Sequence, residues 1–296
     1  MWILLTLCAA ALQTGRFVLQ KKLAGSGLSA AGATFSRFVF GAPLAIAGAL
    51  ILLPEMGRPA DLFGQMGAGF WAYVVIGGAA QASATLLLVR LFALRNFAVG
   101  IAFTKTEVVQ VALMSLVFLG DRIAVLGWVG IVLGLVGVLC LSRPPEGGIA
   151  GRAAVYGIVA GGLFGLSAIA YRGATLELMP LPFMGRAFVT LACVTSVQTL
   201  GMGLCLRLFQ PGELTRVLRA WSRTIWVGIL GAAGSAGWFM AFALQNAAYV
   251  RALGQVEMVF TLCASVLIFH ERLHRREAVG IALVLASVIV VVLAAA

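Results

Sequence analysis

A lysine and a glutamate lie two residues apart in the middle of a largely apolar stretch. Lys105 and Glu107 are the charged residues of the segment FTKTEVVQV (103–111), and mostly apolar residues surround it from 97 to 119. On a helix the two side chains would point about 200° apart, so they would not share a face. Because an unpaired ion inside a bilayer is costly, each charge needs its own partner or water.

Arginines in other apolar stretches could be partners for such glutamates. At about 1.5 Å of rise per residue, Arg37 lies about 9 Å into its stretch, which matches the level of Glu107 in a neighbouring one. Arg186 and Glu257 stand in the same relation in the second half of the chain. We therefore expect two ion pairs, Arg37–Glu107 and Arg186–Glu257, that lock neighbouring helices together. The alternative is that Glu107 or Glu257 binds and releases protons.

Lys105 is not matched by a second basic residue, because neutral Gln255 stands at the equivalent position 150 residues later. With the two pairs neutralised, Lys105 would leave one positive charge near the middle of the bilayer and favour an anionic or zwitterionic solute. The alternative is that its ammonium group reaches the nearer interface. Other polar or aromatic residues within apolar stretches are expected to line the same cavity: Gln13, Gln81, Gln110, Tyr171, Trp238 and Gln255.

The composition requires lipid around these elements. Of 296 residues, 62% are hydrophobic and 10% are charged, against about 25% charged in soluble domains. We predict an all-α integral membrane protein with ten transmembrane helices. The predicted helices are 2–20, 31–53, 69–94, 98–119, 123–142, 152–172, 183–209, 224–246, 249–270 and 275–295. The net charge of +11 comes mostly from residues between these helices, which indicates membrane anchoring rather than nucleic-acid binding.

The chain contains an internal repeat with an offset of 150 residues. Residues 92–142 and 242–292 share 16 identities in 51 positions, among them Glu107 and Glu257. The repeat divides the chain into halves, 1–144 and 150–295, of five predicted helices each. Because five is odd, the second half enters the membrane from the opposite side, and inverted repeats of this kind are typical of secondary transporters with a substrate site between the halves.

Motifs in both halves resemble the EamA-type transporters of the drug/metabolite transporter (DMT) superfamily. In the first half these are Gly15-Arg16-Phe17, Arg37-Phe38, FALRN at 92–96, Glu107 and Gly120-Asp121-Arg122. In the second half they are Arg186, FALQN at 242–246, Glu257 and His270-Glu271-Arg272. The resemblance implies two five-helix EamA repeats. The family commonly has proline directly after the mid-helix glutamate, and because Val108 and Met258 stand there instead, we expect helices four and nine to be straighter than usual.

The resemblance also implies a function. We expect a multi-pass protein of a bacterial cytoplasmic membrane that exports a small metabolite such as an amino acid, with no cofactor. Broad drug efflux is one alternative, and a non-transporting scaffold or receptor is another. We expect a monomer, with a homodimer as the alternative. Family members usually keep both termini in the cytoplasm, whereas the positive-inside rule predicts the reverse for this distribution of arginines, so orientation stays open.

An enzyme is not expected from these residues. The two histidines, His270 and His274, stand in one predicted loop, and no second catalytic partner is placed on a neighbouring helix. No GxxxxGK[ST] phosphate loop occurs, and the five cysteines show no CxxC spacing, so neither an ATPase nor a metal site is indicated. Helix one carries no acidic residue, so proton coupling of the kind used by small multidrug resistance proteins is not supported.

Overall fold

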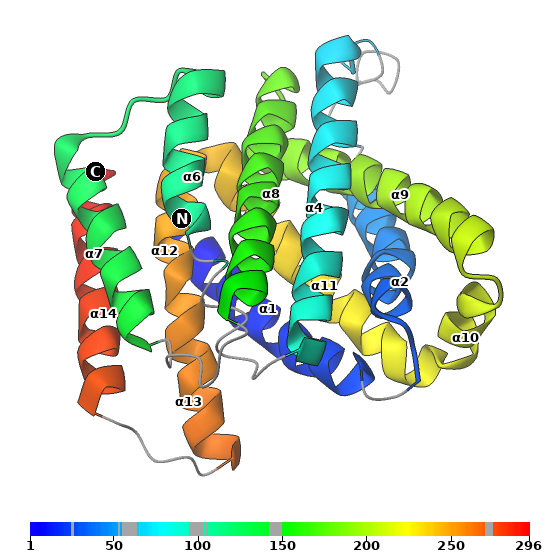
Figure 1. Cartoon of the computed structure of the whole chain (residues 1–296). Coiled ribbons are helices and arrows are strands. Elements are labelled where there is room, and N and C mark those ends of the chain that lie inside the picture. Colours follow the sequence, from blue (N-terminus) through cyan, green and yellow to red (C-terminus); the bar gives the residue numbers. More distant parts are fainter. Residues whose placement is uncertain are drawn as a thin grey trace.

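The computed structural model describes residues 1–24, 27–52, 54, 64, 66–94, 104, 106–141, 150–269 and 275–296. The regular structure in this part of the chain is helical (Figure 1). The elements of the first half are α1 (Trp2–Ala24), α2 (Ala30–Leu52), α4 (Ala68–Leu94), α6 (Glu107–Met114), the π-helical turn η2 (Ser115–Leu119) and α7 (Val125–Leu141). Those of the second half are α8 (Ala150–Glu177), α9 (Phe183–Phe209), α10 (Glu213–Arg219), α11 (Trp221–Leu244), α12 (Ala247–Leu253), the 3-10 turn η3 (Gly254–Val256), α13 (Glu257–Phe269) and α14 (Arg275–Ala294).

Several of these helices are long and apolar enough to cross a membrane, so the protein is a multi-pass membrane protein. Within the described residues, six helices meet this criterion, in α1, α2, α4, α8, α9 and α11. Three further helices are apolar but shorter: Glu107–Leu119, Val125–Cys140 and Ala278–Ala294. The predicted total of ten spans stays a prediction, because it depends partly on the shorter helices.

The helices pack in pairs that follow the internal repeat. α1 packs on α11 and α4 packs on α8, and these two pairs are equivalent through the repeat. α2 packs on α9 and α7 packs on α14, and here each helix contacts its own counterpart. Figure 1 shows the α7–α14 pair at one edge of the bundle, with α2, α9 and α10 at the other.

The helices that contact their own counterparts are antiparallel. A Cβ added at Gly130 of α7 would meet Val291 of α14, whereas one added at Gly137 would meet Val284. Rising residue numbers in α7 therefore correspond to falling numbers in α14, and the glycines let the two backbones approach closely. This antiparallel packing is the arrangement expected of an inverted repeat.

The helix predicted over 249–270 contains an irregular turn, and the expectation that it is straighter than usual for the family stays a prediction. The α-helical hydrogen bonding of α12 gives way to the 3-10 turn Gly254–Val256, and α13 begins at Glu257. Gly254 allows a large side chain to approach, since a Cβ there would lie 2.6 Å from the Trp238 ring. The 3-10 turn thus begins at a glycine that packs against Trp238, three residues before Glu257.

Candidate functional site

A cavity lies between the two halves of the protein. Its volume of about 30 Å³ is enough for about two water molecules. The lining residues come from α1, α2, α4 and α6 of the first half and from α8, α11, α12 and α13 of the second. The polar and charged residues among them are Gln13, Arg37, Gln81, Thr104, Glu107, Ser167, Tyr171, Ser235, Trp238, Arg251 and Glu257.

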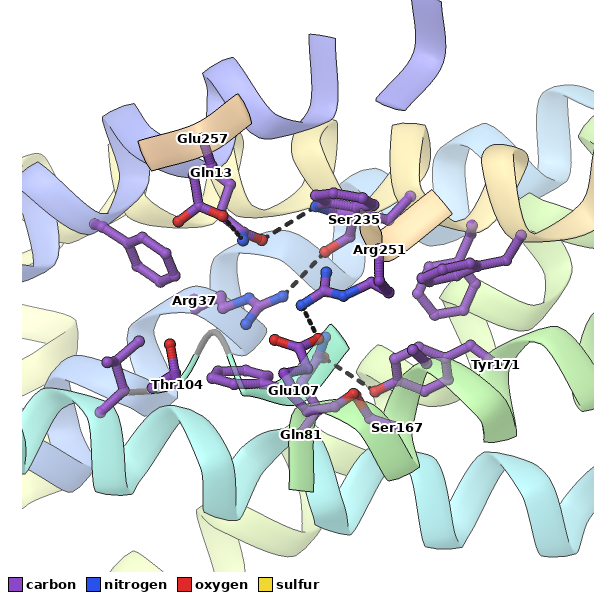
Figure 2. Close-up of a pocket in the computed structure, with 17 residues that line it drawn as sticks. Gln13, Arg37, Gln81, Thr104, Glu107, Ser167, Tyr171, Ser235, Arg251 and Glu257 are labelled. Carbon is purple, nitrogen blue, oxygen red and sulfur yellow. Dashed lines mark hydrogen bonds and ion pairs between the residues drawn. The ribbon is translucent and has the colours of Figure 1, made fainter. Parts of the chain in front are cut away.

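Charges of both signs face this cavity (Figure 2). The guanidinium groups of Arg37 and Arg251 lie between Glu257 on one side and Glu107 on the other. Arg251 forms an ion pair with Glu107 and stacks over the Trp238 ring at 4.8 Å from its centroid. Because Glu107 belongs to α6 and Arg251 to α12, this ion pair joins the two halves.

The two glutamates occupy equivalent places at the starts of helices. Glu107 is the first residue of α6 and Glu257 is the first residue of α13, where the helix dipole stabilises a negative charge. Gln13 Nε2 donates to Glu257 Oε2 at 2.9 Å, and Gln13 Oε1 accepts from Trp238 Nε1 at 3.1 Å. This chain of hydrogen bonds orients the Glu257 carboxylate at the cavity wall.

Arg37 is a buried cation with neutral hydrogen-bond partners. Its Nη1 lies 3.3 Å from Thr85 Oγ1 and its Nη2 lies 3.1 Å from Ser235 Oγ. The side chain crosses α11 at Gly231, where a Cβ would lie 2.9 Å from Arg37 Cγ. A guanidinium has five N–H donors, so Arg37 has donors beyond these two contacts with which to bind an anion in the cavity.

A polar network and aromatic rings form the remaining walls. Tyr171 Oη lies 3.0 Å from Gln81 Oε1 and 3.0 Å from the Gly77 carbonyl oxygen. Gln198 Nε2 donates to Gln81 Oε1 at 3.1 Å, which connects α9 to the cavity wall. The Tyr171 ring stacks on Phe239 with the centroids 4.4 Å apart. The cavity thus combines polar groups with flat apolar surfaces.

Most of the residues expected from the sequence meet in this cavity. Seven of the candidates line it: Gln13, Arg37, Gln81, Glu107, Tyr171, Trp238 and Glu257. Lys105 lies outside the described residues. Three other candidates are placed elsewhere, and each faces a contact between helices: Gln110, Arg186 and Gln255.

Gln110 and Gln255, which we expected to line the cavity, lie between helices instead. Gln110 Nε2 lies 3.2 Å from Thr106 Oγ1, and a Cβ at Gly162 of α8 would meet Gln110 Oε1, so Gln110 faces α8. Gln255 is buried between α7 and α14, where a Cβ at Gly134 would meet both Gln255 and Ser287. Helical position alone does not say which neighbour a face meets, and this is why the sequence could not separate these residues from the lining ones.

The two predicted ion pairs are wrong. In the described part of the chain, Glu107 pairs with Arg251, and Arg37 donates to hydroxyl groups. Arg186 Nη2 donates to the Ala243 carbonyl oxygen at 3.2 Å near the C-terminal end of α11. The prediction used depth in the membrane, which fixes the level of a side chain but not its direction. Because α2 packs on α9 and α11, Arg37 is directed at Ser235 instead of Glu107.

Arg251 is the functional candidate that the sequence analysis missed. It was not among the candidates expected from the sequence, yet its side chain is only 13% exposed and lines the cavity. The repeat contained a signal for it, because Arg251 is aligned with the apolar residue Ile101. A charged residue whose counterpart in the other repeat is uncharged, as is also the case for Lys105, is a candidate for the functional site.

A second polar cluster joins the halves at one end of the cavity. Arg172 of α8 donates from Nε to Asp121 Oδ2 at 3.0 Å and from Nη2 to Asp121 Oδ1 at 3.4 Å. Its Nη1 donates to the carbonyl oxygens of Phe242 and Gln245 at 2.9 and 2.8 Å, where α11 ends. One guanidinium therefore holds the turn before α7 and the end of α11 together, and we call this set of contacts the Arg172 clamp.

Ser115 extends the Arg172 clamp to the next helix. Its hydroxyl lies 3.0 Å from Asp121 Oδ2 and 3.2 Å from Asn246 Oδ1. Asn246 caps α12, because its Oδ1 accepts from the Ala248 backbone N–H at 2.8 Å. The cluster thus connects η2, the turn before α7, the end of α11 and the start of α12.

Comparisons with known proteins agree with this architecture. The family model described as "EamA-like transporter family" matches residues 1–143 and 151–293. A protein whose structure is titled only "Crystal structure of protein" is similar over 98% of this chain and 97% of its own, with a TM-score of 0.69. At 16% identity this likeness shows the fold alone. No curated protein matches the sequence. Since the family model matches both halves, the chain belongs to the EamA-like transporter family, whose members are membrane transporters of the DMT type.

Proposed function

We propose that the protein exports a small metabolite such as an amino acid across the cytoplasmic membrane by alternating access between its halves. The observation that carries this proposal is the cavity at their interface, where arginine and glutamate side chains from both halves face one space. Inverted-repeat transporters bind substrate at such an interface. A molecule with a carboxylate and an ammonium group presents charges complementary to this lining.

Arg37 is the residue suited to a substrate carboxylate. It is 5% exposed, lines the cavity and has the neutral partners Thr85 and Ser235. A carboxylate would accept charge-assisted hydrogen bonds from its guanidinium, and such bonds are roughly twice as strong as neutral ones. The substrate ammonium group would lie toward Glu257, whose carboxylate Gln13 orients. The aromatic rings of Tyr171 and Phe239 would contact an apolar substrate side chain.

The cavity volume supports a mechanism in which the site opens and closes. A volume of about 30 Å³ holds water but not an amino acid. Substrate entry therefore needs the halves to move apart on one side. At one end of the cavity, the Arg172 clamp joins first-half Asp121 to second-half Arg172. We assign to this clamp the closure of that end, so that substrate reaches the cavity from it only after the clamp opens.

Transport measured in proteoliposomes against a panel of solutes tests this proposal. The panel contains amino acids, the corresponding amines without a carboxylate, and apolar cationic drugs, each with and without a proton gradient. We expect amino acids to move and Arg37→Gln to reduce their transport by about tenfold or more, since a hydrogen bond to a charged group contributes roughly 1.5–3 kcal/mol. Transport of the amines should change little.

Arg186→Gln is the matched control, because Arg186 is also a buried arginine of the helix that corresponds to α2. It contacts the Ala243 carbonyl oxygen rather than the cavity. This variant should keep the preference for amino acids over amines even if its overall activity falls. Movement of cationic drugs but not amino acids would favour the efflux alternative, to which the aromatic walls and Glu257 would also be suited. Movement of no solute would favour the scaffold alternative.

A further inference from the structure

The corner formed by the end of α9, by α10 and by the start of α11 has the composition of a lipid-headgroup site. Arg207, Arg216, Arg219 and Arg223 are all exposed there. The acidic residue of this corner, Glu213, is buried at 3% exposure. The outer surface of the corner is therefore basic, and the one negative charge is directed into the protein.

Buried contacts fix α10 in place as a platform. Glu213 Oε1 accepts from the Ser29 backbone N–H at 2.6 Å, and Gln210 Oε1 accepts from the Ser29 hydroxyl at 2.8 Å. Val217 is fully buried in a cluster with Leu206 of α9. Because one face of α10 is held by these contacts, the arginines on its other face project from a defined surface. The contacts also connect this surface to the start of α2, the helix that carries Arg37.

Large apolar side chains lie beside the arginines. Trp221 is 57% exposed, Leu218 is 53% exposed and Phe209 is 79% exposed. Tryptophan is enriched where acyl chains meet headgroups, and exposed leucine and phenylalanine suit acyl chains. Arginine forks bind phosphate oxygens with two parallel hydrogen bonds. Basic and apolar groups are thus arranged together as an anionic phospholipid would require.

We propose that this α10 corner is a binding surface for anionic glycerophospholipids, with Arg216, Arg219 and Arg223 on the headgroup and Trp221 beside it. The proposal goes beyond transport and does not depend on the substrate. Each arginine near the surface of an anionic membrane contributes roughly 1 kcal/mol, which is about fivefold in affinity. The attraction is electrostatic, so the preference should weaken as salt is added.

Quenching of tryptophan fluorescence by brominated phospholipids tests the proposal. The whole protein is reconstituted with brominated phosphatidylglycerol or brominated phosphatidylcholine, and the signal from Trp221 is obtained by comparison with Trp221→Phe. The wild-type protein should prefer phosphatidylglycerol at Trp221 by about an order of magnitude or more. The triple variant Arg216→Gln, Arg219→Gln, Arg223→Gln should lose this preference. Thermal unfolding in phosphatidylcholine should change little, because the three side chains are exposed and the ion pair of Arg216 with Glu213 has an arginine that is 67% exposed.

The double variant Arg275→Gln, Arg276→Gln is the matched control. Both residues are exposed arginines at the start of α14, remote from α10 in the fold (Figure 1). This variant should keep the preference at Trp221. Three outcomes would overturn the proposal: no preference in the wild-type protein, a preference that survives in the triple variant, or an equal loss in the control. The last result would mean that total charge, and not the α10 corner, attracts the lipid.

Discussion

Arg251 and Glu107 form a buried ion pair that neutralises two of the charges at the cavity. Their side chains are 13% and 3% exposed. Removing two charges from water is costly, and the pair repays the cost only when both partners are present. The Trp238 ring under Arg251 adds a cation–π contact. The pair therefore favours the packing in which α6 of the first half meets α12 of the second, because each charge then has its partner.

The ion pair predicts strong coupling between two substitutions. We expect Arg251→Gln alone to lower the free energy of unfolding by about 3–5 kcal/mol, since it leaves Glu107 buried without this partner. Adding Glu107→Gln should recover a large part of that loss. Thermal unfolding of both single variants and the double variant in one detergent measures the coupling. Additive losses would show that the two residues act separately.

At the scale of residues, the sequence identified polar side chains of the cavity more readily than the partners to which those side chains bind. A polar residue in an apolar stretch is conspicuous, and Gln13, Gln81 and Tyr171, which we expected to line a cavity, do line one. Arg37 also lines the cavity, but we had expected it only as the ion-pair partner of Glu107. The sequence did not give its partners, because they depend on the rotation of α2 about its axis. Packing against α9 and α11 sets that rotation, and a single sequence does not encode it in any periodic pattern.

At the scale of elements, the ends of helices carry the chemistry. Glu107 and Glu257 begin α6 and α13, and the Arg172 clamp, extended by Ser115, connects the start of η2, the end of α11 and the start of α12. The π-helical turn η2 lies directly beside this clamp, and such turns are frequent at functional sites. The π-helical turn η2 and the 3-10 turn at Gly254 were not predicted, because neither contains the proline that marks an irregular turn in a sequence.

Opening the Arg172 clamp should expose the cavity. In a background without the native cysteines, Ser167→Cys places a thiol on the cavity wall, five residues before Arg172 in α8. We expect Arg172→Gln to increase the rate at which a water-soluble thiol reagent labels this cysteine by about tenfold, since it removes four hydrogen bonds. Two of them, to Asp121, join the halves.

Arg216→Gln is the control for this experiment. Arg216 also forms an ion pair, at 3.2 Å with Glu213, but its side chain is 67% exposed and the pair lies within one helix. Labelling of the Ser167→Cys thiol should be the same with and without this control substitution. If both substitutions increased the labelling rate equally, or if neither increased it, the Arg172 clamp would not be what closes the cavity.

At the scale of the whole molecule, the repeat decided the architecture. The offset of 150 residues and the odd number of predicted helices in each half led to the inverted arrangement, and α7 and α14 pack antiparallel accordingly. This part was predictable because a duplicated sequence records its own symmetry. The cavity volume was not predictable, because it depends on how closely the two halves approach in one state.

The inverted arrangement predicts the sides of the membrane on which particular residues lie. Ten spans place both termini on one side and α10 on the other. In a background without the native cysteines, an impermeant thiol reagent added to intact cells should label only one of Thr215→Cys and Ala296→Cys. The second should react after the membrane is permeabilised. Labelling of both in intact cells would contradict the ten-span topology, and the identity of the labelled one gives the orientation.

The pairs α7–α14 and α2–α9 lie along the pseudo-two-fold axis that relates the two halves. Each pair consists of a helix and its own counterpart, so its packing is the same when the halves exchange roles. The pairs α1–α11 and α4–α8 instead exchange with each other. In the alternating access proposed above, two states related by the pseudo-two-fold axis would therefore pivot along the two self-paired seams at opposite edges of the bundle, while α1, α4, α8 and α11 would move around the cavity.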